Sequence, residues 1–364
     1  MAGVPEDPRG PTREPEYEMI GGVIDDQRSG LAKPALQAPP HAHRAQTAAD
    51  AWQDAATSFA SWRFWTACSL GIAAAGGAAA ATVAAAEANG WFGVPLASAR
   101  YLLMAVFMAL PAAVLGAIWG FRHSRGRLPV VLLSGAWRGL AIAAVAGAVL
   151  LVVGIAVGGP AALTGAAVVV IVLEVVVFGL IGAGARTCFA AAAPGAFLAT
   201  LVVAFLCVGN VLATVLLLPG TVGMGQASVP VNVQRDESGT VTAYECVGEL
   251  RPVEVAHTDR VVWVAAANPA LILGSIGADM VPTGSDLGWV LAGLQRTADG
   301  PSRDVPCLDG VPGDGRAPSI PVALTGLAFQ ALTAALVVIP GRRLDARRRR
   351  VTPGSGSPAA GTQR

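Results

Sequence analysis

The chain has 364 residues, of which 54% are hydrophobic and 13% are charged, and its mean hydropathy is +0.57. A soluble protein of this length rarely has so apolar a composition, so the composition argues against a soluble protein and indicates a membrane protein. The net charge of +1 gives no support for nucleic-acid binding, because a membrane protein is governed by where its cations lie and not by their sum.

The N-terminal segment 1–47 is rich in Pro, Gly, Glu, Asp and Arg, which predicts a disordered cytoplasmic tail. It holds no early apolar run behind a basic start, so no cleavable signal is expected and the first span directs insertion. Beyond it, aromatic and small residues recur at helical intervals, namely Trp52, Ala55, Phe59 and Trp62. This spacing predicts an amphipathic helix at the inner membrane interface; the alternative is a cytoplasmic extension of the first span, with the tryptophans as an aromatic belt.

Six apolar stretches are each close to the ~20 residues that a helix needs to cross a bilayer. They are 65–86, 101–121, 130–157, 163–184, 195–218 and 320–340. Three arginines follow the second stretch, Arg186 follows the fourth and six follow the sixth directly, whereas the first gap holds only Arg100 and the third holds no basic residue. The positive-inside rule therefore places both chain ends in the cytoplasm.

The fold class that follows is an all-α polytopic membrane protein with six transmembrane helices and a partly β extracytoplasmic domain between helices five and six. The interfacial helix and the first five spans occupy 48–218, and the external domain occupies 219–319. The last span covers 320–341, and a basic cytoplasmic tail covers 342–364. Glycines four residues apart, at Gly116/Gly120, Gly135/Gly139 and Gly154/Gly158, predict surfaces for close helix packing, without assigning a dimer interface.

Two charged residues, Arg138 and Glu174, fall inside the apolar stretches, where an ionised group costs about 3 kcal/mol or more unless it is paired or hydrated. At about 1.5 Å per residue, both lie roughly 13 Å from the cytoplasmic ends of their helices, so they can pair between the third and fourth spans. One interpretation is a polar element of a translocation path. The other is structural: a buried pair, or Arg138 reaching the inner surface while Glu174 stays protonated.

The region 219–319 carries Pro, Gly, Asp and Arg throughout and is predicted to lie outside the cell. Val, Thr and Tyr content predicts strands at 228–234 and 240–247, and 250–256 can supply a third. Cys246 and Cys307 are the two cysteines of this region, and an extracytoplasmic pair is free to form a disulfide; the alternative is two free thiols.

The apolar run 261–274 in the same region is too short for a seventh crossing and contains Pro269 near its middle. A seventh crossing would also place the arginine-rich tail outside. A broken or re-entrant helix around Trp263, Asn268 and Pro269 satisfies both constraints if its backbone is buried against the spans.

Several short motifs in the second half of the chain together resemble a group of actinobacterial ABC transporter permeases of the type-2 exporter class. They are Ala185-Arg186-Thr187-Cys188-Phe189, then Trp263, Asn268-Pro269 and Leu273, then Ile320-Pro321 and Gly341-Arg342-Arg343-Leu344. The resemblance implies six helices, an interfacial N-terminal helix, re-entrant helices before the last span, and a homodimer or heterodimer driven by separate ATPase subunits. The chain departs from the group in lacking an arginine-rich start to the first span and in its larger cysteine-containing insertion.

No enzyme chemistry is expected in the chain. Its one lysine, Lys33, lacks the glycine-rich setting of a phosphate loop, and its four histidines are scattered, so no metal, cofactor or catalytic site is predicted. ATP hydrolysis is therefore expected on a partner. The inner loop after the second span is predicted to contact that ATPase through Phe121, Arg122, Arg125 and Arg127; alternatively the arginines only set topology.

The leading hypothesis is thus the permease subunit of an ABC exporter in a bacterial plasma membrane, in contact with lipid and with an ATPase subunit. A multi-pass anchor for a sensing or scaffolding external domain is the first alternative. An ion-coupled transporter with Glu174 as its proton site is the second.

Overall fold

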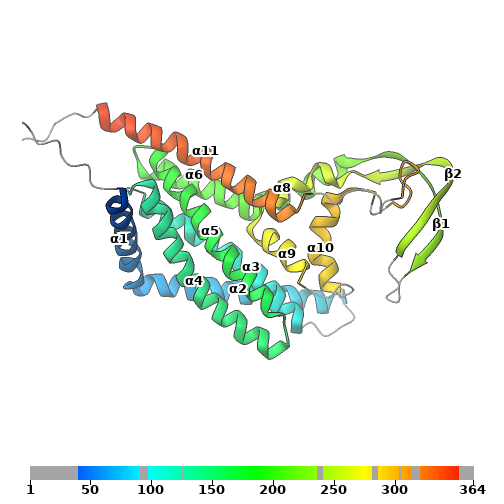
Figure 1. The fold of residues 1–364 in the computed structure, drawn as a ribbon, viewed down its shortest axis with the longest axis horizontal. Helices are drawn as coiled ribbons and strands as arrows, with labels where there is room; N and C mark the ends of the chain where they lie inside the picture. Colours follow the sequence, from blue (N-terminus) through cyan, green and yellow to red (C-terminus); the bar gives the residue numbers. More distant parts are fainter. Residues whose placement is uncertain are drawn as a thin grey trace, which may run out of the picture. The chain divides into compact units, whose positions relative to one another are not determined.

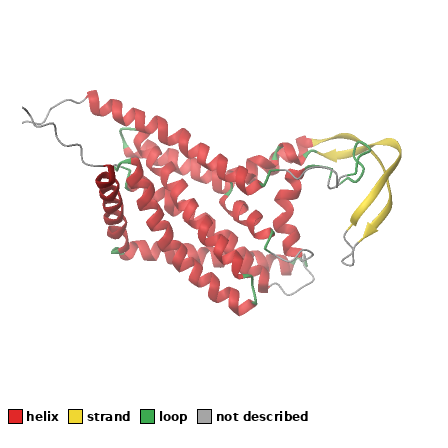
Figure 2. Cartoon of the chain, in the orientation of Figure 1, coloured by secondary structure: helices red, strands yellow, loops and turns green. Residues whose placement is uncertain are grey.

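The computed structural model describes residues 40–90, 97–124, 126–235, 241–280, 286–302, 305–312 and 320–351. Within these ranges, six helices are long and apolar enough to cross a membrane, which confirms the predicted number of spans. They are Trp62–Ala88, Ser98–Arg122, Leu128–Val157, Ala161–Cys188, Ala192–Thr221 and Val322–Arg348. Figure 2 shows that the strands drawn in yellow are confined to a single two-stranded ribbon.

Helix α1 (Pro40–Phe59) is separate from helix α2 (Trp62–Ala88), so the first span does not extend continuously into α1. The helical conformation is interrupted at Ser61, whose backbone is extended. The Trp65 indole donates to the Phe59 carbonyl across this interruption at 2.9 Å. Helix α1 begins at Pro40, within the segment 1–47 that the sequence assigns to the tail. Proline suits a first helical position, and the alanines that follow favour helix.

Helix α5 (Ala161–Cys188) packs against α3 (Ala97–Arg122), α4 (Leu128–Val157), α6 (Ala192–Ala204) and α11 (Val322–Val351) (Figure 1). Its fully buried side chains include Leu163, Ile171, Phe178 and Ile181. Because these neighbours surround it, a polar side chain on the packed faces of α5 is shielded from lipid and water.

Glycines allow α3 and α5 to approach backbone to backbone. A Cβ atom on Gly116 would lie 2.6 Å from the Val175 carbonyl oxygen, and one on Gly120 would clash with the Gly179 backbone. Gly139 of α4 is similarly close to Val172. These contacts confirm the packing role predicted for Gly116, Gly120 and Gly139, since only small residues permit this spacing.

The fifth membrane helix is irregular at its centre. It consists of α6, a π-helical turn η1 (Phe205–Gly209), α7 (Asn210–Leu217) and a 3-10 turn η2 (Leu218–Thr221). A π turn carries one extra residue and leaves backbone groups imperfectly paired, and such turns often mark functional positions.

Strands β1 (Val222–Arg235) and β2 (Val241–Ala256) form an antiparallel pair that matches Val222 with Ala256. The predicted third strand at 250–256 is wrong, because it is the continuation of β2. The misleading signal was Gly248, which sits in a bulge with a φ of 97°, a conformation that favours glycine. The predicted turn between the strands lies at 236–240, outside the described residues.

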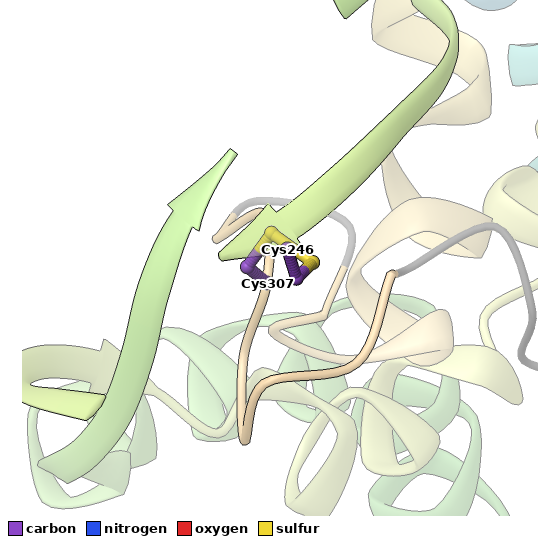
Figure 3. Close-up of a disulfide and its surroundings, with 2 residues drawn as sticks. All are labelled: Cys246 and Cys307. Carbon is purple, nitrogen blue, oxygen red and sulfur yellow. A yellow bond between two sulfur atoms is a disulfide. The ribbon is translucent and has the colours of Figure 1, made fainter. Parts of the chain in front are cut away.

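A disulfide joins Cys246 of β2 to Cys307, the pair that the sequence predicts (Figure 3). The segment that carries Cys307 also bonds to β1: Ser228 donates its amide to the Cys307 carbonyl, and Leu308 forms a bridge with Ala227. The crosslink spans 61 residues, so the chain-entropy model gives it about 4 kcal/mol of stabilisation.

The remaining helices lie on either side of the predicted break. Helix α8 (Val262–Ala266) ends before Asn268, and α9 (Pro269–Ala278) begins directly after it, which confirms a broken helix at this position. The sequence analysis missed α10 (Asp286–Asp299), which packs against α9. The last helix α11 continues past Pro340 to Val351, so the part of the basic tail that is described is helical.

Candidate functional site

Arg138 of α4 holds α1 against the helix bundle. Its guanidinium group donates to the Asp54 carboxylate at 2.9 Å, to the Asp54 carbonyl at 3.0 Å and to the Ser58 hydroxyl at 3.0 Å. The Arg138 side chain is 3% exposed, and Trp137 next to it packs edge-on against Trp52 of α1. A charge-assisted contact and an aromatic contact therefore connect the same two helices.

The predicted pairing of Arg138 with Glu174 is wrong. Arg138 is bonded to α1, whereas Glu174 is bonded to Gln330 of α11. The helical position of each residue was read correctly, but the partner of each lies on an element more than eighty residues away in the chain.

The polar pocket is a cavity of about 500 Å³ where α1 meets the ends of α3 and α5. Its lining residues are Asp54, Phe121, Arg122, His123, Ser124, Gly126, Val130, Val131 and Arg186. It brings together both short gaps that the arginine pattern predicts to be cytoplasmic. Of the predicted coupling residues, Phe121 and Arg122 line the pocket, and Arg127 is exposed just before α4. Arg125 lies outside the described residues.

The basic end of α11 is bound to the same two gaps. Arg342 donates to the Gly126 carbonyl at 2.8 Å, and Arg348 donates to the carbonyls of Thr187 and Cys188. Carbonyls at the C-terminal end of a helix lack partners within the helix, so an arginine there satisfies them and favours the helix dipole. The end of the last span is thereby connected to the pocket.

The joint between α8 and α9 is held by Asn268, which is 3% exposed. Its side-chain oxygen accepts from the amides of Ala270 and Leu271 and so caps α9. Its side-chain nitrogen donates to the Cys207 carbonyl in the π turn at 2.7 Å. The two irregular points of the membrane helices therefore contact each other.

Glu174 lies beside this joint and is fully buried. The Gln330 side-chain nitrogen donates to the Glu174 carboxyl at 3.1 Å and to the Ala267 carbonyl at 3.0 Å. A single amide thus connects α5, α11 and the end of α8. The sequence analysis missed Gln330 and Asn210, although both are polar residues inside apolar helices and the rule that identified Glu174 could have identified them.

Two apolar grooves follow the contact between α3 and the fifth membrane helix. The groove that shares Phe121 and Arg122 with the polar pocket, called the lower groove, has a volume of about 480 Å³ and runs along 114–122 and 196–208. The other, called the upper groove, has a volume of about 410 Å³ and is lined by 103–107, 211–218 and parts of α8 to α10. The lower groove ends at Cys207 and Val208, and the upper groove starts at Val211. The contact between Asn210 and Asn268 lies between the end of the lower groove and the start of the upper groove.

Among the residues that the structure describes, no three His, Cys, Asp or Glu side chains gather closely enough to hold a metal ion. Trp263 packs instead with Val262, Ala266 and Val322 in a small apolar cluster.

No protein-family model, curated protein or solved structure matches this chain. The geometry of the pocket, the joint and the grooves is therefore the basis for any functional assignment.

Proposed function

We propose that this chain is the membrane-spanning subunit of an ABC exporter and that a separate ATPase subunit drives it. The observation that carries the proposal is the polar pocket, where α1, the loop after α3 and the end of α5 form one surface. A permease without a nucleotide site can be driven only through its cytoplasmic surface. The pocket lining also includes Val130 and Val131 of α4, so a contact here would act on α3, α4 and α5 together, and through Arg342 and Arg348 on α11.

The order of the elements also supports this proposal. A helix precedes the first span and a broken helix precedes the last span, as the resemblance to type-2 exporter permeases implies. The same resemblance implies a dimer of permeases. The two grooves offer an almost entirely apolar lining, which suits an apolar or amphipathic substrate.

The orientation in this proposal places the polar pocket in the cytoplasm and the strands outside. Native cysteines test it in intact cells without any mutation. After a membrane-impermeant reductant, an impermeant maleimide is expected to label Cys246 and Cys307, and without the reductant it is expected to label neither. Cys188, at the opposite end of the helices, is the internal control and should react only after lysis. Labelling of Cys188 in intact cells would contradict the orientation.

The ATPase contact is tested with two arginines at opposite ends of α3, both exposed. Arg122→Gln is expected to weaken association with the co-purifying ATPase subunit about tenfold, which corresponds to about 1.4 kcal/mol. Removing this arginine takes away a cation that can pair with acidic partner residues. The measurement is titration of the purified subunits in lipid nanodiscs.

Arg100→Gln is the matched control and should leave the affinity unchanged. Equal affinities for the wild type and Arg122→Gln, with orientation preserved, would mean that Arg122 serves topology alone.

A further inference from the structure

Three buried amide and carboxyl side chains surround the joint between α8 and α9: Glu174 and Gln330 reach it through the Ala267 carbonyl, and Asn210 of α7 reaches it through Asn268. Glu174, Gln330 and Asn210 each have no exposed surface. Within the described part of the chain, three of their atoms have no hydrogen-bond partner: Glu174 Oε2, Gln330 Oε1 and Asn210 Nδ2. Buried polar atoms nearly always have hydrogen-bond partners. Three unpaired atoms around one joint therefore indicate a site that binds a further group or adopts a second hydrogen-bonding arrangement.

The charge of Glu174 decides which occupant fits. In the described residues, no Lys, Arg or His side chain bonds to its carboxyl group, and the donor that it has is the neutral amide of Gln330. An ionised carboxylate in such a setting is costly because no counter-charge or water stabilises it, whereas the protonated acid carries no charge and supplies a hydrogen-bond donor.

We propose that Glu174 binds and releases a proton inside the membrane, and that Gln330 transmits the change of charge to the joint between α8 and α9. Release of the proton to water leaves a carboxylate, which draws the Gln330 amide toward itself. In the structure the amide donates to the Ala267 carbonyl at 3.0 Å, and this hydrogen bond weakens when the amide moves toward the carboxylate. That carbonyl belongs to the break between the two short helices, so protonation and the geometry of the joint are coupled. The proposal does not depend on which partner drives the protein.

A proton fits better than a metal cation, because the Gln330 nitrogen occupies the space between the Glu174 and Ala267 oxygens that a cation would share. Cys207 of the π turn is a titratable residue at the same joint, where its carbonyl accepts from Asn268. The other charged residues on the helices around α5 are engaged elsewhere or lie near helix ends. They are Arg138 on Asp54, Arg100 and Arg122 of α3, Arg186, Asp279 after α9, and the residues after Pro340, namely Asp345 and the arginines around it.

Infrared difference spectroscopy of the full chain in lipid nanodiscs measures the proton directly. Between mildly acidic and strongly alkaline buffer, the wild type is expected to lose the carbonyl-stretch band of one buried carboxylic acid. The band should be missing at every pH in Glu174→Gln, which has nearly the same shape, and kept in the control Glu87→Gln, whose side chain is exposed. A wild type that shows no such band, or a band that alkali does not remove, overturns the proposal even if the variant fails to fold.

Hydrogen–deuterium exchange tests the coupling. At alkaline pH, the amides of 262–271 are expected to exchange at least threefold faster in the wild type than in Glu174→Gln, which imitates the protonated acid. In mildly acidic buffer the two proteins should exchange equally, and comparison at one pH removes the intrinsic effect of pH on exchange. Equal exchange at both pH values would mean that the joint does not respond to Glu174 and would overturn the proposed role of Gln330.

Discussion

Asp54→Asn is expected to lower the free energy of unfolding by about 2–3 kcal/mol, because it leaves the buried guanidinium group of Arg138 without a counter-charge. Loss of one partner of a fully buried pair costs about 3–5 kcal/mol, and the expected value is smaller here because the Asp54 side chain is 28% exposed. Reversible unfolding in mixed micelles, followed by tryptophan fluorescence, measures the effect.

A control on the same helix separates the pair from a general effect of lost charge. Asp50 is exposed, so Asp50→Asn should change stability by less than about 0.5 kcal/mol. Combining Asp54→Asn with Arg138→Met removes both charges and should recover part of the loss, which gives the coupling energy between the two side chains. If Asp54→Asn and Asp50→Asn have the same effect, the contact between α1 and α4 rests on the aromatic residues and not on the ion pair.

Gly120→Ala is expected to destabilise the protein by about 3 kcal/mol, because the added Cβ would overlap the backbone of Gly179 and force α3 away from α5. Backbone atoms cannot move aside as the end of a flexible side chain can. The same unfolding measurement applies, together with the yield of monodisperse protein in mild detergent.

Gly77→Ala is the matched control, since it makes the same chemical change within a membrane helix where no heavy atom lies within 4 Å of the new Cβ. This substitution should stabilise by up to about 1 kcal/mol through helix propensity alone. The difference between the two variants therefore isolates the packing of α3 on α5. Similar stabilities for both would show that this close contact can open without cost.

The sequence interpretation is wrong where one local residue pattern is compatible with two structures. The sequence predicts separate strands at 240–247 and 250–256, but Gly248 between them forms a bulge inside β2, because a glycine with positive φ occurs in bulges as well as at strand ends. The helix α10 was missed because it lies among Pro, Gly and Asp residues that resemble a loop. The broken helix at Asn268 was predicted, since proline acts on the backbone next to it whatever surrounds it.

The sequence by itself determined three features: six helices long and apolar enough to cross a membrane, the interruption before Pro269, and the cysteine pair that forms the disulfide. These depend on local hydrophobicity, on backbone chemistry and on there being one cysteine pair in the region. The tertiary structure alone decided that Arg138 bonds to Asp54, that Glu174 bonds to Gln330, and that the π turn contacts Asn268. Helical spacing reports how deep a side chain lies and on which face, but its partner depends on which helices are neighbours. That choice is made by the close packing of α3, α4 and α11 around α5, where glycines and side chains far apart in the chain must fit together.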